Sequence, residues 1–244
     1  MNPEMKPWND KAAATGDPQT QGTWPDSLRD DWRAMLAADR PLEAVWHGGA
    51  FPLQRRRESE AMVDLCENIS HRVIMEIGAD KGGGLINWLS LSPDTMIALE
   101  VRGCPYADIL RPVYRHTKFL FGEASSYDDM TVRHIGDYLD GRPVDILFID
   151  GDKANFLRDF DAYRPFMRPG GIVFMHDITD RSPGMAFAEV ELSYVTAKII
   201  DTTESAEAMI RERNGIDPAS PHEAWLRTWQ GRSCGVGVIH IPEN

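Results

Sequence analysis

The chain has 244 residues, 42% of them hydrophobic, which suits one sizeable core and leaves too little for a second full domain. Its formal net charge of -12 would repel a phosphate backbone, so nucleic acid is not an expected partner. No apolar run reaches the roughly 18 residues of a membrane helix, and the first residues lack the apolar centre of a signal peptide. We therefore expect a cytoplasmic protein with no membrane partner.

Two helices are predicted ahead of the main fold. Residues 1–50 combine a polar arm, rich in Pro, Gly and Gln, with one amphipathic helix at 27–38. A second helix is predicted at 57–69, with Met62, Leu65 and Ile69 on one side. Such an N-terminal extension often makes subunit contacts, so we expect a homo-oligomer.

From residue 70 onward, short apolar runs rich in β-branched residues alternate with helical stretches, as in βαβ units. Near-continuous apolar strands are typical of a parallel sheet that is covered on both faces. The sequence predicts an α/β, doubly wound, mostly parallel seven-stranded sheet in one domain, 51–244, with a polar insertion at 202–233. The predicted strands are 72–77, 95–100, 118–122, 145–150, 171–176, 198–201 and 235–241, the last two antiparallel to each other, and the predicted helices are 83–91, 106–114, 130–139, 155–166 and 185–197.

The glycine-rich segment VIMEIGADKGGG runs from a strand into a turn that opens a helix. Gly78 and Gly82 allow the backbone to approach a ligand closely, and such turns lie at the ligand-binding end of an open α/β sheet. Glu100 ends the next strand, where an acid can accept both ribose hydroxyls, as in dinucleotide and S-adenosylmethionine enzymes alike. Glu76 beside the turn suits a cationic cofactor without phosphate better than a pyrophosphate.

Three polar side chains follow the fourth and fifth strands: Asp150, and then His176 with Asp177. Neighbouring parallel strands would place them on one rim of the sheet. Two carboxylates and an imidazole predict a divalent cation site, with oxygen ligands favouring magnesium and the histidine allowing manganese or another transition metal. The alternative is that Asp150 caps the next helix and His176 fills a polar gap in the core.

With these motifs the chain resembles the class I S-adenosylmethionine-dependent methyltransferases, over residues 52–241. Their first motif is an acid, any residue, glycine, three residues and glycine, and EIGADKG matches it. The resemblance implies a Rossmann-like methyltransferase fold, Glu76 near the amino-acid part of the cofactor and Glu100 on the ribose. It also places Glu123 or Ser125, in the segment FGEASS, beside the adenine.

The fourth strand is similar to that of catechol O-methyltransferase-type enzymes and of bacterial relatives that methylate sugars or aromatic natural products. In those enzymes a metal-binding aspartate is followed three residues later by a lysine, as Asp150 is by Lys153. The resemblance implies a metal-assisted O-methyltransferase of a small molecule, with Lys153 or His176 accepting the hydroxyl proton. His176 stands where the family has an acid, so His176 could instead be the base of a metal-free variant. Two other classes stay open, a nicotinamide-dependent oxidoreductase and a catalytically silent cofactor-binding protein.

Overall fold

The computed structural model describes residues 54, 56–80, 82–104, 110, 114–199 and 235–243. The predicted N-terminal arm and helix, most of the helix at 106–114 and the insertion at 202–233 lie outside the described residues. The division into an extension and a domain therefore stays a prediction. Within the described ranges, no helix is long and apolar enough to cross a membrane.

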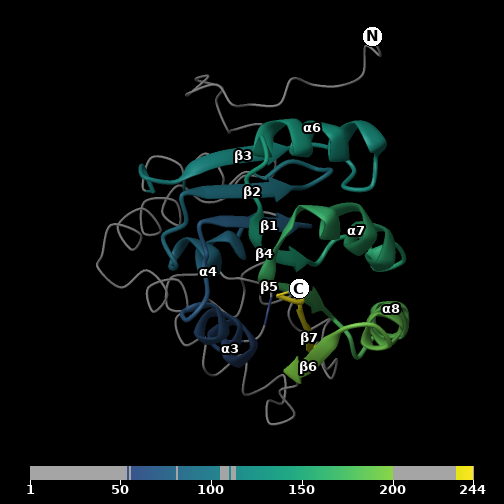
Figure 1. Cartoon of the computed structure of the whole chain (residues 1–244). Helices are drawn as coiled ribbons and strands as arrows, with labels where there is room; N and C mark the ends of the chain where they lie inside the picture. The colour runs from purple at the N-terminus through teal and green to yellow at the C-terminus, as the bar shows by residue number, and fades with distance from the viewer. Residues whose placement is uncertain are drawn as a thin grey trace, which may run out of the picture.

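The described strands form one seven-stranded sheet in the order β3-β2-β1-β4-β5-β7-β6 (Figure 1). Strand β7 runs antiparallel to both of its neighbours, and every other pair is parallel. The predicted fold class is confirmed. The strands are β1 (Val73–Ile77), β2 (Thr95–Leu99), β3 (Lys118–Gly122), β4 (Val144–Ile149), β5 (Met167–His176), β6 (Val195–Ile199) and β7 (Val236–His240).

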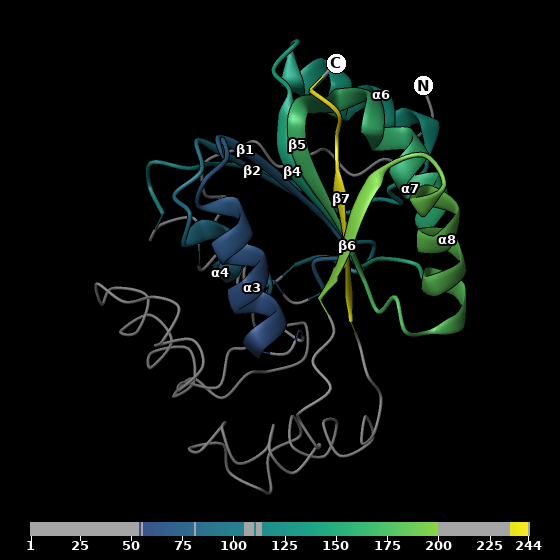
Figure 2. The same cartoon turned by 60° about the horizontal axis from the view of Figure 1, so that its bottom comes forward.

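Helices cover both faces of the sheet (Figure 2). Helices α3 (Arg56–Cys66) and α4 (Leu85–Leu89) lie on one face, and α6 (Asp129–Leu139), α7 (Phe156–Tyr163) and α8 (Arg181–Glu191) on the other. Because successive strand residues point to opposite faces, Phe148 packs with Trp88 of α4 at a ring distance of 5.3 Å, while Ile149 joins the core under α7. Both faces are buried, which explains the continuous apolar strands.

The chain after β5 differs from the prediction. A helix at 185–197 and a strand at 198–201 were expected, but α8 ends at Glu191 and β6 already begins at Val195. All five residues of β6 pair with β7, so the pairing extends over the β-branched Val195 and Thr196. The helical prediction there was wrong because sheet pairing outweighed the local pattern. The predicted antiparallel pair at the sheet edge is confirmed.

The buried side of α3 is also rotated relative to the prediction. Met62 and Cys66 are fully buried, whereas Leu65 is 40% exposed. Glu58 therefore lies on the buried face, one turn before Met62, and is itself fully buried. A carboxyl group on the core side of this helix needs a partner, and the sheet provides one.

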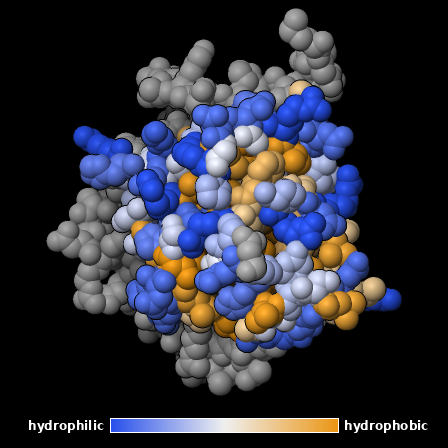
Figure 3. All heavy atoms as spheres, in the orientation of Figure 1, coloured by the Kyte–Doolittle hydropathy of each residue, from blue (hydrophilic) through white to orange (hydrophobic). Residues whose placement is uncertain are grey.

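Apolar side chains reach the surface near the sheet edge formed by β6. Met185 is 65% exposed, Leu192 85% and Val195 74%, all in or next to α8 and β6. Figure 3 shows apolar groups among polar ones on the face of the molecule that carries these elements.

The order of strands reverses between β1 and β4, since the chain leaves β1 toward β2 on one side and returns through β4 on the other. Ligands of open α/β sheets bind at the carboxyl ends of the strands at such a reversal. The two strand ends are tied together, since Asp150 N donates to Ile77 O at 2.8 Å. The glycine turn and the Asp150 loop are thereby neighbours.

Candidate active site

Gly78 is the point at which the two halves of the site meet. Its φ of +84° belongs to the left-handed region, and a Cβ there would lie 2.5 Å from Asp150 O and from Gly151. No other residue type fits both conditions. Gly82, four residues on, also has a positive φ, of +94°. At Gly78 the backbone of the predicted turn is therefore in direct contact with the backbone of the Asp150 loop.

Glu76 lies beneath this turn. It is 1% exposed, and a Cβ on Gly84 would lie 2.6 Å from Glu76 Oε1. Its Oε2 has no hydrogen-bond partner among the described residues. Burial, reinforced by the charge of Asp150, raises the pKa of Glu76 well above its usual range. A buried carboxyl with an unused oxygen favours a ligand that brings a donor or a positive charge.

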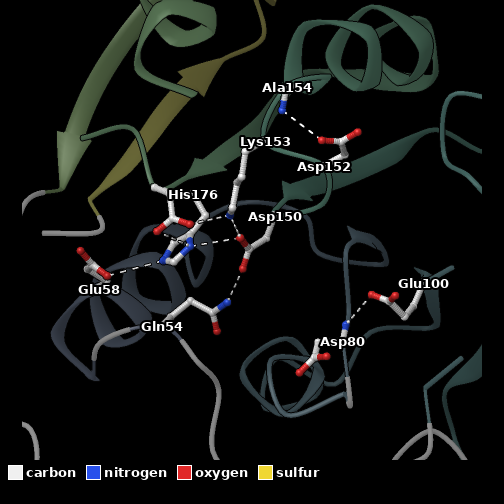
Figure 4. A network of polar contacts seen from close by, with 10 residues as sticks. Gln54, Glu58, Asp80, Glu100, Asp150, Asp152, Lys153, Ala154 and His176 are labelled. Atoms are coloured by element: carbon white, nitrogen blue, oxygen red, sulfur yellow. Dashed lines mark hydrogen bonds and ion pairs between the residues drawn. The ribbon is translucent and has the colours of Figure 1, made fainter. Parts of the chain in front are cut away.

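Glu100 is held at the end of β2 by backbone groups. Its Oε2 accepts a hydrogen bond from Asp80 N at 2.9 Å (Figure 4). Its Oε1 accepts one from Arg102 N at 3.0 Å. Asp80, the donor of the first of these bonds, has a φ of +45°. Each carboxylate oxygen keeps a further lone pair, so Glu100 can still accept from two hydroxyls.

The loop after β3, predicted to contact adenine, is anchored from below. Glu123 is exposed and Ser125 half-buried, whereas the next residue, Ser126, is buried. Ser126 Oγ donates to Asp159 Oδ1 of α7 at 2.5 Å, and Tyr163 Oη donates to Ser126 O at 2.6 Å. The sequence did not single out Asp159, which holds the Ser126 side chain, or Tyr163, which holds the Ser126 backbone. The roles of Glu123 and Ser125 stay predictions.

On the other side of Gly78, four side chains converge as the strand ends predicted. His176 Nδ1 lies 3.2 Å from Asp150 Oδ1 and 3.3 Å from Asp177 Oδ1. Lys153 Nζ pairs with Asp150 Oδ1 and lies 2.5 Å from Asp177 Oδ2. Asp177 has a φ of +58°, a conformation that an aspartate tolerates and that costs of order 1 kcal/mol or more. Figure 4 shows Lys153 and His176 both directed at one oxygen of the Asp150 carboxylate, with Gln54 at the other.

The acids hold both candidate proton acceptors in their charged forms. Burial alone would lower the pKa of Lys153, but the carboxylates of Asp150 and Asp177 outweigh it and raise that pKa. The same balance, with Glu58 contributing, raises the pKa of His176 well above its usual value. In this arrangement both groups are donors. The lowered pKa that Lys153 would need to act as a base is not what these contacts produce.

Two residues of the site were missed at the sequence level. Gln54 Nε2 donates to Asp150 Oδ2 at 2.8 Å, and Glu58 Oε2 lies 3.7 Å from His176 Nε2. Gln54 lies shortly before α3 and Glu58 in its first turn, both almost a hundred residues before Asp150. A polar residue on the apolar side of an amphipathic helix is the signal that could have indicated Glu58. Glu58 was not recognised as a core residue because the buried side of this helix was predicted to include Leu65, which is exposed.

The residues present fit a divalent cation. One ligand atom from each of Asp150, His176 and Asp177 falls within 4.8 Å of the others. The carboxyl groups of Glu58, Asp150 and Asp177 and the ammonium group of Lys153 surround His176. With a neutral imidazole the site would carry an excess of about two negative charges, which a divalent cation would balance. The neighbouring Asp152 is not part of this group, because it is exposed and accepts from Ala154 N at 3.1 Å in the turn before α7.

Comparison with known proteins identifies the domain. A family described as a methyltransferase domain matches residues 75–178. No curated protein sequence matches the chain. The match decides between the two cofactor classes that the strand, the glycine turn and the ribose acid had left open.

Solved structures of methyltransferases with different acceptor atoms share the fold. O-Methyltransferase TomG from Streptomyces achromogenes, involved in tomaymycin synthesis and solved with SAM, is 13% identical, with a TM-score of 0.52 over 91% of this chain and 92% of that one. N-Methyltransferase NodS from Bradyrhizobium japonicum, solved with S-adenosylhomocysteine, is 13% identical, with a TM-score of 0.50 over 88% and 99%. Precorrin-6y C5,15-methyltransferase from Geobacter metallireducens is 14% identical, with a TM-score of 0.53 over 77% and 89%.

At these identities the likeness establishes the fold and leaves the acceptor open. Together with the domain match it confirms the predicted class. Residues 75–178 form a methyltransferase domain, on the fold of the class I S-adenosylmethionine-dependent methyltransferases.

Proposed function

We propose that the protein transfers the methyl group of S-adenosylmethionine to a hydroxyl oxygen of a small molecule, assisted by a divalent cation. The observation that carries the proposal is the division of the site about Gly78. A backbone-anchored acid, Glu100, stands on one side, and the Asp150, Lys153, His176 and Asp177 group stands on the other. A cofactor lying over Gly78 would reach both.

The donor half suits the cofactor in three places. Glu100 offers two oriented oxygens to the ribose hydroxyls. Glu76, buried with an unused Oε2, favours the positively charged end of the molecule. Glu123 or Ser125 would contact the adenine in a loop that Ser126 and Asp159 hold in place. Positioning the sulfonium methyl for in-line attack can itself contribute roughly 7–11 kcal/mol to catalysis.

The acceptor half would bind and prepare the hydroxyl. Asp150, His176 and Asp177 would hold the cation, and a bound cation lowers the pKa of a hydroxyl that it contacts. Lys153, held between the carboxylates of Asp150 and Asp177, donates hydrogen bonds and limits their repulsion. With Nδ1 on the cation and Nε2 facing Glu58, His176 has no nitrogen for the substrate proton, which would pass to solvent. Only in a variant without the cation would a neutral His176 be the acceptor of that proton.

Cofactor binding and turnover can be tested separately. Calorimetric titration with S-adenosylhomocysteine should show binding, and titration with NADH should show none. Asp150→Ala should lower methyl transfer by about 100-fold or more, with cofactor affinity changed less than about 3-fold, because Asp150 belongs to the acceptor half. Asp152→Ala removes a neighbouring exposed carboxylate and serves as the control. Equal loss of binding and turnover in Asp150→Ala would contradict the assignment, and binding without turnover on any acceptor would favour a silent protein.

The acceptor belongs, in this proposal, to the sugars or aromatic natural products. The resemblance of the Asp150 segment supports this class. Screening such compounds for products heavier by one methyl group tests the acceptor class. A cytoplasmic homo-oligomer remains our expectation, supported by the exposed apolar side chains of Leu192 and Val195 at the β6 edge.

A further inference from the structure

The environment of His176 differs on the two sides of its ring. On one side, Nδ1 faces the carboxylates of Asp150 and Asp177 at 3.2 and 3.3 Å. On the other, Nε2 faces Glu58 Oε2 at 3.7 Å (Figure 4). The ring is 3% exposed and packs edge-on against Phe148, so it has little freedom to turn. Its Nε2 makes no hydrogen bond within the described residues, although it is buried and aimed at a carboxyl group.

Glu58 is fixed independently of His176. It is fully buried on α3, and its Oε1 accepts a hydrogen bond from Gly235 N at 2.8 Å, which ties α3 to the start of β7. The other oxygen is the one directed at the imidazole. Without a cation, the nearer carboxylates of Asp150 and Asp177 attract the ring proton to Nδ1. A cation between those carboxylates would repel a proton from Nδ1, and the carboxylate of Glu58 would then hold the ring proton on Nε2 and leave the Nδ1 lone pair for the cation.

The spacing around Nδ1 fits metal coordination. Bonds of about 2.1 Å separate two ligand atoms by about 3.0 Å at right angles and about 3.4 Å at the tetrahedral angle. The separations of Nδ1 from the two aspartate oxygens, 3.2 and 3.3 Å, lie between these values. One imidazole nitrogen with two carboxylates suits manganese, iron or zinc, whereas magnesium prefers oxygen ligands alone.

We propose that Glu58 is a positioning residue that orients His176 as a nitrogen ligand, so that the site selects a transition-metal cation over magnesium. The inference rests on the proposed cation site and goes beyond it in naming the class of metal and a residue outside the methyltransferase motifs. The sequence left magnesium and a transition metal both open, and the inference favours the transition metal.

The test is cation binding by the full chain without an acceptor. Mn²⁺ and Mg²⁺ are titrated in separate experiments into the wild type, Glu58→Gln, His176→Asn and the control Asp64→Asn, which removes an exposed carboxylate from the same helix. Glu58→Gln keeps an oxygen for Gly235 N and removes the charge. Thermal unfolding and S-adenosylhomocysteine affinity, measured on the same samples, report on the fold and on the cofactor half of the site.

The wild type should bind Mn²⁺ at least 10-fold more tightly than Mg²⁺. Glu58→Gln should weaken Mn²⁺ binding by about 10- to 100-fold while Mg²⁺ and S-adenosylhomocysteine affinities stay within about 3-fold. His176→Asn, which replaces nitrogen by oxygen, should bring the two cations to similar affinity, and Asp64→Asn should match the wild type. A purely structural role for Glu58 would lower the affinities for both cations together.

Three results would overturn the inference: tighter Mg²⁺ than Mn²⁺ binding by the wild type, unchanged Mn²⁺ affinity in Glu58→Gln, or no binding of either cation. None of these touches the cofactor assignment, which fails only if S-adenosylhomocysteine does not bind. Should Glu58→Gln not fold, the wild type and His176→Asn alone decide the selectivity. Glu58→Asp then tests the positioning role, because it keeps the negative charge but moves it away from His176 by the length of one methylene group. It should bind Mn²⁺ with a smaller preference over Mg²⁺ than the wild type.

Discussion

Asp159, beneath the predicted adenine loop, is a buried carboxyl whose ionisation opposes folding. It is fully buried, its Oδ1 accepts from Ser126 Oγ, and its Oδ2 has no hydrogen-bond partner among the described residues. Burial raises the pKa of Asp159 to about 6, although the bond from Ser126 acts in the opposite direction. We predict that Asp159→Asn removes a free-energy cost that the wild type incurs near neutral pH.

The sign follows from proton linkage. Because the pKa of Asp159 is higher in the folded protein than the ordinary 3.8, the folded state binds more protons between about pH 4 and 6. Stability from this group is therefore lost as the pH rises, and the whole cost is present above pH 6. A displacement of about two pKa units corresponds to about 3 kcal/mol in total, of which about 1.5 kcal/mol develops between pH 5 and 7.5.

The assay is urea unfolding followed by tryptophan fluorescence at pH 5 and 7.5. Subtracting the wild-type free energy of unfolding from that of Asp159→Asn at each pH cancels the other titrating groups. Comparing this difference at the two pH values then cancels the constant cost of the buried amide. This difference should shift by about 1.5 kcal/mol in favour of the variant as the pH rises. Asp161→Asn, an exposed position on α7, should show no shift. A difference for Asp159→Asn that does not change with pH would refute the reasoning.

Three further variants test the site. Gly78→Ala should abolish S-adenosylhomocysteine binding in calorimetry and lower the unfolding temperature far more than the control Gly141→Ala. Both glycines have a positive φ, of +84° and +77°. An added Cβ would lie 2.5 Å from backbone atoms at Gly78, whereas at Gly141 it would meet nothing within 4 Å. Glu100→Gln should weaken the same binding at least 10-fold, since its amide would oppose one of two backbone N–H donors, and an unchanged dissociation constant would exclude the ribose role. Lys153→Met should reduce turnover by about 100-fold. Mn²⁺ should bind no more weakly, because the variant lacks the ammonium group that competes with the cation for the carboxylates of Asp150 and Asp177. Full activity in a methyl-transfer assay would show that Lys153 is dispensable.

The parts of the site that follow a strand directly were predictable. Glu76, Gly78 and Glu100 are found where the sequence placed them, because a residue that ends a parallel strand lies at the same edge of the sheet as the ends of its neighbours. The same reasoning brought Asp150, His176 and Asp177 together. The chemistry of that group was not predictable, since the charges of Lys153 and His176 depend on how many acids surround them.

Residues that reach the site from elsewhere in the chain escaped the sequence. Glu58 faces His176 only because α3 packs against the sheet on its Met62 and Cys66 side, and that side was misjudged by about one residue. Asp159 supports the adenine loop only because α7 lies beneath it. Neither contact has a counterpart in local spacing.

The sequence by itself determined the strands, the glycine turn and the acids at the strand ends, because β-branched apolar runs, positive-φ glycines and strand ends are encoded within a few neighbouring residues. Only the tertiary structure decided that β6 begins at Val195, and that Gln54, Glu58 and Gly235 meet around Asp150 and His176. These contacts join positions about a hundred residues or more apart. They depend on the order of strands and on which side of each helix is buried, and such long-range choices leave no periodic pattern in the chain.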